Sequence, residues 1–337
     1  MTIKDIAKSC GVSVSTVSRV LNQHPDVSEA VRQQILREVE RSGYVPNNSA
    51  RDLVRSRSDA IGVVVRGTGN LFFSSVLKTI ATELDSRGYS AVLRFIDSDD
   101  DEVKAGAILE REKKLRGLLF LGGRFDYTPG ELASIGVPYV CVSYTNCFGT
   151  LDERDYSSVS IDDHLTAMRA TRELICRGHR RIAALIPGRS DRSISELRFQ
   201  GYLAALEEAG IQPDDRLVEE TGGCFTMPET YEGMLRLLRR TRDFTAVLTL
   251  SDTTGIAAMK AMEDSGLRVP EDCSLIAIDG LTVSEYVTPT LTTMVQPAEE
   301  MGRESVRILL DTLEKGAATR HLRLEARLRE GASLRSI

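Results

Sequence analysis

Short apolar runs alternate with helical stretches over most of this chain, and this alternation restricts the fold more than any other feature. IGVVV at 61–65 is followed by a helical stretch at about 72–87 and then by SAVLRF at 90–95. The later apolar runs are GLLFL, PYVCV, RIAALI, TAVLTL and CSLIAI. Such alternation predicts mostly parallel sheets covered by helices. Because the pattern occurs in two rounds, we expect two similar α/β subdomains.

The N-terminal segment has a different, all-helical pattern. Gly11 follows a first apolar face where a turn is expected, and Ser13 and Ser28 are candidate N-caps of two further helices. The apolar positions at helical spacing are Ile3, Ile6, Ala7 and Cys10, then Val17, Val20 and Leu21, then Val31, Ile35, Leu36 and Val39. This pattern predicts a helix, a tight turn, a second helix and a third helix that ends at Gly43.

The second of these helices has an unusual set of polar residues: Ser13, Ser15, Thr16, Ser18, Arg19 and Asn22. Short hydroxyl side chains are poor helix formers, so they are odd choices for a face that only meets water. They suit a helix that lies against phosphate groups, because a short donor lets the backbone approach closely. Arg19 can reach the O6/N7 edge of a guanine in a major groove. The pattern favours DNA binding; the alternative is a three-helix packing domain with a polar surface.

The charge distribution agrees with a division into two parts. The whole chain has 43 Lys and Arg against 49 Asp and Glu, a formal net charge of −6. Residues 1–60 carry nine basic and seven acidic residues, whereas the remainder carries 34 basic and 42 acidic ones. Any binding to a polyanion therefore belongs to the N-terminal segment.

The N-terminal sequence TIKDIAKSCGVSVSTVSRVLN resembles the DNA-binding head of the lactose-repressor (LacI/GalR) family of bacterial transcription regulators. Similar motifs continue along essentially the whole chain, among them GYVPN at 43–47, RGHRRI at 177–182 and LTTMVQP at 291–297. The resemblance implies that Val14, Ser15 and Arg19 contact bases. It implies phosphate contacts for Thr2, Ser13, Thr16, Ser18, Asn22 and Ser28.

The stretch YVPNNSARDLVRSRSD at 44–59 has the composition of a polar interdomain linker. A helix this short is unstable alone in water. By resemblance, however, it matches the family's hinge helix, which folds when two copies meet over the centre of the operator. Leu53 then matches the leucine that enters the minor groove. The other DNA-binding residues implied here are Asn47, Ala50 and Arg51.

For the rest of the chain, the resemblance implies the periplasmic sugar-binding-protein fold, with an effector cleft between two subdomains. Crossover segments are expected near Ser160, Pro289 and Arg320. Ligands of such sheets bind at the carboxyl ends of the strands. The residues that match effector-binding positions are Phe72, Phe73, Gly123, Arg124, Ser143, Arg198, Phe225, Ser251, Asp252 and Asp279.

Two of these positions depart from the family pattern. Ser251 stands where most relatives have Asn, and Val142-Ser143-Tyr144 stands where many have Ile-Asp-Arg. One ligand-binding carboxylate is thus missing, while Arg124 follows a neighbouring strand end. An acidic or phosphorylated sugar is therefore one hypothesis for the effector. For any single Phe among the cleft residues, packing in the core is the alternative.

Together these patterns predict an all-α helix-turn-helix head at 1–46, joined by a hinge helix and linker at 47–59 to an α/β body at 60–337 with two parallel-sheet subdomains. We expect the first subdomain to contain roughly 60–160 plus 290–320, and the second 161–289 plus 321–337. A last strand, RLEARLREGAS, is followed by no heptad region, so we expect a dimer rather than a tetramer.

Motifs for catalysis or cofactor binding are not found in the sequence. Gly67-Thr68-Gly69 follows a strand, but Phe72 stands where a dinucleotide fingerprint needs its third glycine. The acidic run at 97–102 lacks the glycine and the final glutamate of a calcium loop. We therefore expect no enzyme, no cofactor and no metal, although spacing does not exclude a site assembled only in space. Six scattered Cys and the lack of a long apolar run indicate a cytoplasmic protein with reduced thiols.

These features lead us to expect a homodimeric transcription regulator that represses from a pseudo-palindromic operator on double-stranded DNA. A small-molecule effector, a carbohydrate by resemblance, sets the operator affinity from the cleft. Three alternatives stay open: the same regulator controlled by a protein co-effector, an enzyme or carrier with the sugar-binding fold, and a non-specific architectural DNA binder.

Overall fold

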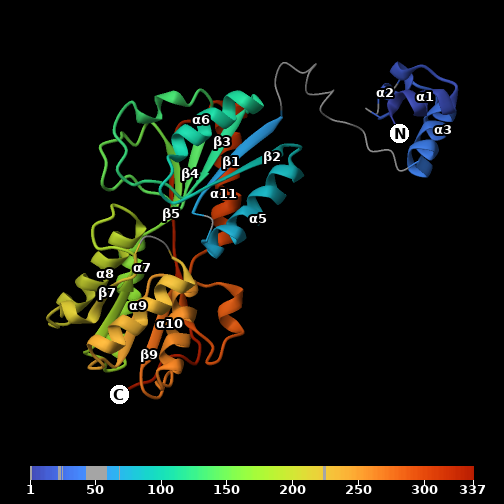
Figure 1. Cartoon of the computed structure of the whole chain (residues 1–337). Helices are drawn as coiled ribbons and strands as arrows, with labels where there is room; N and C mark the ends of the chain where they lie inside the picture. Colours follow the sequence, from blue (N-terminus) through green and yellow to red (C-terminus); the bar gives the residue numbers. More distant parts are fainter. Residues whose placement is uncertain (1, 22–23, 25, 43–58, 68, 223–224) are drawn as a thin grey trace. The chain divides into compact units, whose positions relative to one another are not determined.

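The computed structural model describes residues 2–21, 24, 26–42, 59–67, 69–222 and 225–337. It divides into two compact units, Met1–Ser58 and Asp59–Ile337, which we call the head and the body and describe separately (Figure 1). The predicted hinge at 47–59 falls almost entirely outside the described residues. The helices of the head are α1 (Ile3–Cys10), α2 (Val14–Leu21) and α3 (Glu29–Ser42).

The head has a small apolar core to which all three helices contribute. Its buried members are Ile6, Ala7, Cys10, Val17, Val20 and Ile35. Gly11 adopts a φ of 65° between α1 and α2, a backbone conformation that favours glycine. The Thr16 N–H donates to Oγ of Ser13 at 3.1 Å, which confirms the prediction that Ser13 is the N-cap of α2. Leu36 is a wrong prediction: it is 42% exposed, because it follows Ile35 by one residue and lies off the buried stripe.

The first subdomain of the body is built on a sheet that is parallel throughout, with strand order β11-β5-β4-β3-β1-β2. Its strands are β1 (Ala60–Arg66), β2 (Ser90–Ile96), β3 (Gly117–Leu121), β4 (Tyr139–Val142), β5 (Ser157–Ile161) and β11 (His321–Leu324). Helices α5 (Leu71–Ser86) and α11 (Ala298–Lys315) cover one face, and α6 (Glu102–Lys113) covers the other.

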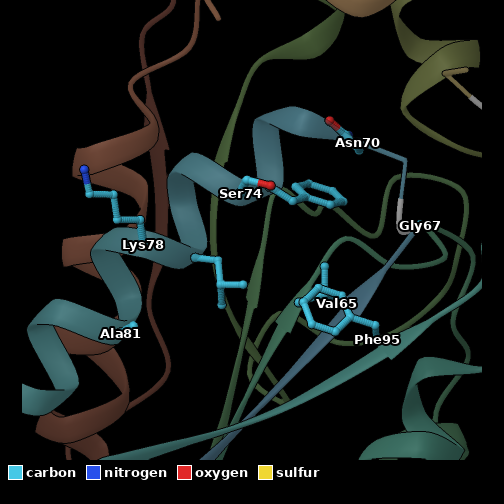
Figure 2. Close-up of a pocket in the computed structure, with 9 residues that line it drawn as sticks. Val65, Gly67, Asn70, Ser74, Lys78, Ala81 and Phe95 are labelled. Atoms are coloured by element: carbon cyan, nitrogen blue, oxygen red, sulfur yellow. The ribbon is translucent and has the colours of Figure 1, made fainter. Parts of the chain in front are cut away.

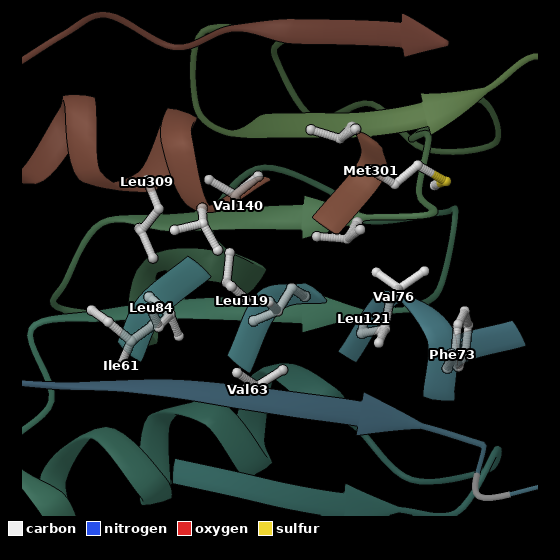
Figure 3. Packing of buried hydrophobic residues seen from close by; sticks show 14 of the residues in the cluster. Ile61, Val63, Phe73, Val76, Leu84, Leu119, Leu121, Val140, Met301 and Leu309 are labelled. Carbon is white, nitrogen blue, oxygen red and sulfur yellow. The ribbon is translucent and has the colours of Figure 1, made fainter. Parts of the chain in front are cut away.

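Figure 3 shows the larger of the two buried layers of this subdomain, where side chains of three neighbouring strands meet those of α5 and α11. Val63 of β1, Leu119 of β3 and Val140 of β4 belong to this layer together with Val76 of α5 and Leu309 of α11. The strands are buried on both faces, which explains why they are continuous apolar runs rather than alternating ones.

The second subdomain repeats this plan, with strand order β12-β10-β9-β8-β6-β7. Its strands are β6 (Ile182–Ile186), β7 (Val218–Glu220), β8 (Ala246–Thr249), β9 (Ser274–Asp279), β10 (Thr292–Val295) and β12 (Arg327–Arg329). Only β12 runs antiparallel to its neighbour among these described strands. Helices α7 (Asp163–Cys176) and α8 (Ile194–Glu208) cover one face, and α9 (Met227–Arg240) and α10 (Asp252–Asp264) cover the other.

The first crossing between the subdomains lies directly after β5, near Ser160 as predicted, whereas the other two differ from the prediction. β10 pairs with β9 in the second subdomain, although 290–320 is predicted for the first. β11 pairs with β5 in the first, although 321–337 is predicted for the second. The single strand predicted as RLEARLREGAS is therefore two strands, β11 and β12, in two different sheets. A short apolar run does not reveal which sheet it extends, so periodicity alone could not place these boundaries.

No helix in the described ranges is long and apolar enough to cross a membrane. The cysteines of these ranges are all unpaired, which agrees with the prediction of free thiols. Cys10, Cys141 and Cys273 are buried, whereas Cys147 and Cys176 are exposed.

Candidate functional site

The first candidate site is the exposed face of α2 in the head. Ser13, Val14 and Ser15 are exposed at its N-terminus, and Val14 leaves 40% of its apolar surface uncovered. The hydroxyl of Ser13 lies 2.7 Å from that of Ser15 and 2.8 Å from that of Thr16. The N-terminus of a helix attracts phosphate through its free N–H groups. This face therefore offers hydroxyl donors and backbone N–H groups to a phosphate backbone.

Arg19 lies on the same helix, one turn further along, with 58% of its side chain exposed. Its Nη1 is 3.1 Å from Oδ2 of Asp26, and Oδ1 of Asp26 is 3.1 Å from Nδ1 of His24. The linear sequence gives no signal for Asp26, because nothing in its pattern places this residue beside Arg19.

The remaining predicted DNA contacts divide into three groups. Thr2 is the N-cap of α1, and its N–H and hydroxyl both donate to the carboxylate of Asp5 at 2.8 Å each. Ser18 is half-buried, and Ser28 is exposed directly before α3. The other residues of the prediction, which are Asn22, Asn47, Ala50, Arg51 and Leu53, lie outside the described residues.

The second candidate site is a cleft between the two subdomains of the body. Six of the predicted effector-binding residues line one cavity there: Phe72, Ser143, Arg198, Phe225, Ser251 and Asp279. Three lining residues were not predicted: Asn70, Ile194 and Gln296. The cavity volume is about 10 Å³, which is room for about one water molecule. A ligand of sugar size enters only when side chains or subdomains move.

Two residues of this cleft have a backbone conformation that is rare outside glycine. Ser143, directly after β4, has a φ of 56°, and Asp279, the last residue of β9, has a φ of 131°. Each such residue costs on the order of 1–3 kcal/mol and persists only where its surroundings enforce it. The carboxyl ends of one strand from each sheet thus carry strain and meet at the same cavity, as is common at functional sites.

The charged centre of the cleft is Arg198 of α8, which is only 2% exposed. Its Nε is 2.9 Å from Oδ1 of Asp163, its Nη1 donates to the Leu250 carbonyl, and Nη1 is 3.8 Å from Oδ1 of Asp279. Asp163, which the sequence reasoning missed, is the second residue of the Asp162-Asp163 pair that begins α7. A buried guanidinium requires such a counter-charge, because an unpaired one is very costly.

Asp279 is deeply buried, and burial raises its pKa to about 8, against the opposing effect of Arg198. Its Oδ1 accepts from Nε2 of Gln296 at 2.7 Å. Oε1 of Gln296 is buried and has no hydrogen-bond partner. The cleft therefore contains a hydrogen-bond acceptor that is already desolvated and unpaired.

Gln296 and Asn70 could have been found from the sequence by their positions. Gln296 follows the carboxyl end of β10, and Asn70 precedes α5 as its N-cap, accepting from the Phe72 N–H at 3.0 Å. Both lie at the sheet edge where ligands of parallel sheets bind. For Ile194 there is no comparable signal.

Four predicted effector-binding residues do not line the cavity. Phe73 packs in the buried layer between α5 and the first sheet. Asp252, at the start of α10, instead binds the segment that follows β9: its Oδ2 accepts from the Leu281 N–H and the Ser284 hydroxyl at 2.7 Å each. Both residues are thus occupied by the packing of the subdomain to which they belong.

Gly123 and Arg124 lie beside the cleft rather than in its wall. A Cβ at Gly123 would be 2.7 Å from Oε1 of Glu102, so this glycine allows the buried carboxylate to approach. The guanidinium of Arg124 is 3.0 Å from Asp126 and 3.5 Å from Glu131. The positive charge of Arg124, on which the hypothesis of an acidic ligand rests, is thus balanced by these two carboxylates.

The subdomains contact each other on two sides of the cavity. Ile194 and Leu197 at the start of α8 pack against the aromatic cluster of the first subdomain that contains Phe125 and Tyr144. On the other side, Leu281 joins the buried layer of the first subdomain. The cleft is therefore closed by apolar contacts in this arrangement.

Comparison with known proteins identifies the family of the chain. A model of the bacterial regulatory proteins of the lacI family matches residues 2–47, and a model of the periplasmic binding protein-like domain matches residues 171–334. The HTH-type transcriptional regulator MalR of Clostridium butyricum is 37% identical over 334 residues, which cover 98% of this chain and 98% of that protein.

Solved structures extend the likeness to the whole fold. The transcriptional regulator CelR in complex with cellobiose is 32% identical, with a TM-score of 0.72 over 99% of each chain. The Lac repressor dimer bound to operator and the anti-inducer ONPF is 24% identical, with a TM-score of 0.77 over 100% of this chain and 99% of that one, and shows the shared fold. A helix-turn-helix head followed by two such α/β subdomains defines a DNA-binding transcriptional regulator rather than an enzyme. The chain belongs to the lacI family of bacterial regulatory proteins.

The raised pKa of Asp279 predicts a pH dependence of stability. The native state holds a proton on this carboxyl that the unfolded chain releases above its ordinary pKa of 3.8. The contribution of Asp279 to stability is therefore fully present below its ordinary pKa and is lost as the pH rises towards about 8. Across this range the loss is at most about 1.4 kcal/mol per pH unit. Asp279→Asn removes the titration, so urea unfolding at pH 5, 7 and 9 should show a smaller decline than in the wild type.

Asp97→Asn is the matched control, because it removes an exposed aspartate that does not line the cavity. Its unfolding should follow the wild-type pH dependence. Equal pH slopes for the wild type and Asp279→Asn would show that Asp279 titrates at its ordinary pKa.

Proposed function

We propose that this protein is a homodimeric repressor that reads a pseudo-palindromic operator with α2 and responds to an uncharged sugar bound in the cleft. The observation that carries the proposal is the composition of the cleft: two aromatic walls, Phe72 and Phe225, around polar groups at the carboxyl ends of strands from both sheets. Apolar walls with a few convergent polar groups are typical of small-molecule sites.

The polar groups of the cleft favour a neutral ligand. The charge of Arg198 is balanced by Asp163 at 2.9 Å, and Asp279 is a further carboxyl group in the wall. An acidic ligand would meet Asp279 without gaining a free cation, and Arg124 is held by Asp126 and Glu131. The unpaired Oε1 of Gln296 instead accepts from a ligand hydroxyl. These contacts argue against the acidic or phosphorylated sugar, and the relative CelR is seen with cellobiose.

This proposal predicts which sugars stabilise the protein. In a thermal-shift panel, a neutral sugar that binds should raise the melting temperature. At a concentration one hundred times its Kd, such a ligand raises the free energy of unfolding by about 2.7 kcal/mol. Uronic acids and sugar phosphates should have no effect. Gln296→Leu should weaken binding of the active sugar by about tenfold, since it removes one hydrogen bond to a buried group.

Phe148→Ala serves as a control for general loosening, because Phe148 packs in the neighbouring aromatic cluster and does not line the cavity. Its affinity for the sugar should stay within about twofold of the wild type. Stabilisation by sugar phosphates alone would contradict the neutral-ligand proposal. A panel in which no compound acts would favour control by a protein co-effector.

The first subdomain offers a surface suited to a second copy of the chain. β2 is an edge strand, and Leu93 and Phe95 on one of its faces are 44% and 53% exposed. The adjoining pocket of about 260 Å³ is lined by Phe95 and by residues of α5 such as Ser74 and Lys78, and Figure 2 shows Phe95 beside Val65 of β1. Exposed apolar side chains on an edge strand promote association unless they are covered. Covering by the same face of a second copy gives a closed, two-fold dimer that matches a palindromic site.

Phe95→Glu is expected to dissociate this dimer, because it places a charge in the apolar contact. Sedimentation equilibrium should give a mass near 37.1 kDa, half the mass of the wild-type dimer. Ile108→Glu is the control, since Ile108 is 46% exposed on α6, the helix on the opposite face of the sheet. A wild-type protein that sediments as a monomer, or a Phe95→Glu variant that stays dimeric, would contradict this interface.

The operator proposal is tested by selecting bound fragments of the source genome with full-length protein. We expect a two-fold symmetric site, because each protomer presents one α2. Leu53→Ala should lower the affinity for this site by about tenfold or more, since insertion of an apolar side chain stabilises bent DNA. Val54→Ala, the neighbouring truncation, should have a small effect. Fragments without any shared sequence would indicate a non-specific DNA binder.

A further inference from the structure

The head contains an acidic side chain where a DNA-binding surface is least suited to one. Asp26 lies between α2 and α3 and contacts Arg19, the exposed arginine of α2. Phosphates repel a carboxylate, and each negative charge near the backbone opposes binding. A role in binding DNA non-specifically therefore does not explain Asp26.

Stability of the head does not explain Asp26 either. Asp26 and Arg19 are 46% and 58% exposed, and an ion pair of this kind contributes about 0–1 kcal/mol. The buried residues of the head core all lie on the three helices, at positions that do not include Asp26. The contact can be removed while the core stays intact.

The geometry of the contact between Asp26 and Arg19 suits a role in orienting the Arg19 side chain. One oxygen of Asp26 faces Nη1 of Arg19 and the other faces Nδ1 of His24, at 3.1 Å each. Because both oxygens of the carboxylate have a partner, its rotation is restricted, and the ion pair restricts the guanidinium in turn. A guanidinium has five N–H donors, so one contact at Nη1 leaves donors for a bidentate contact with a base.

We propose that Asp26 is a positioning residue that orients Arg19 for base contact and so determines the base preference at the position that Arg19 reads. The inference rests on the proposed reading of an operator by α2. Arginine recognises guanine through two parallel hydrogen bonds, which requires a defined plane and direction of the guanidinium. Without Asp26, the long side chain samples many rotamers and part of the binding energy is spent on ordering it.

The test compares base preference rather than affinity alone. Full-length wild type, Asp26→Ala, Asp26→Asn, Arg19→Ala and the double variant are each measured against the selected operator and all its single-base changes. Asp26→Ala should lower discrimination about threefold to tenfold at one symmetry-related pair of positions, part of the effect of a bidentate contact. Asp26→Asn should restore part of it, because its amide oxygen still accepts from Arg19.

Arg19→Ala should lose the preference at the same pair of positions, and the double variant should lose no more. The control is Glu29→Gln, which also removes one negative charge from the head; Glu29 is 71% exposed and 3.7 Å from Arg32. This variant should change affinity equally for all sequences. Circular dichroism of each variant confirms that the head is folded.

Two results would overturn the inference. If Asp26→Ala binds every sequence more tightly with an unchanged base preference, Asp26 only weakens binding through its charge. If preference changes at positions that Arg19→Ala does not affect, Asp26 acts through another group. A wild-type protein that selects no symmetric site contradicts the proposed function, and the inference fails with it.

Discussion

A guanidinium buried in a protein interior must be paired, and this requirement on Arg198 organises the body. Its partners come from three places: Asp163 at the start of α7, the Leu250 carbonyl after β8, and Asp279 at the end of β9. These elements are far apart in sequence and meet only because parallel strands present their carboxyl ends at one edge. The same edge carries Gln296 and faces Phe72 and Ser143 of the other subdomain. The charged centre of the cleft therefore belongs to the second subdomain, whereas the contacts that close the cleft are apolar.

The head follows the opposite principle. Its core is small and apolar, and its polar side chains remain on the surface, where an individual ion pair contributes little to stability. The value of such groups lies in orientation: Ser13 caps α2, and Asp26 contacts Arg19. A head of this kind can change its sequence preference by surface substitutions without disturbing its fold, whereas a substitution of Arg198 or Asp279 in the cleft changes the balance of buried charges.

Local patterns were sufficient for the fold class, whereas the cleft residues were assigned from the resemblance to the family. Apolar runs located the strands of the sheet centres, and Ser143, directly after β4, and Asp279, the last residue of β9, both line the cavity. The edge strands β11 and β12 were not separated, since pairing partners are a property of the tertiary structure. Arg124 was misjudged for the same reason: Asp126 and Glu131 balance its charge, and no linear pattern gives their distances. The hinge stays a prediction from resemblance.

The crossing of the chain between the subdomains affects how the protein is made. The first sheet needs β11 at 321–324 and the cover of α11, and the second needs β10 and β12, so neither subdomain is complete until almost all 337 residues have been synthesised. The head, by contrast, is finished within the first few dozen residues. During translation the residues of the head are therefore complete long before those of the subdomains, and a prematurely terminated chain contains the head without the complete cleft.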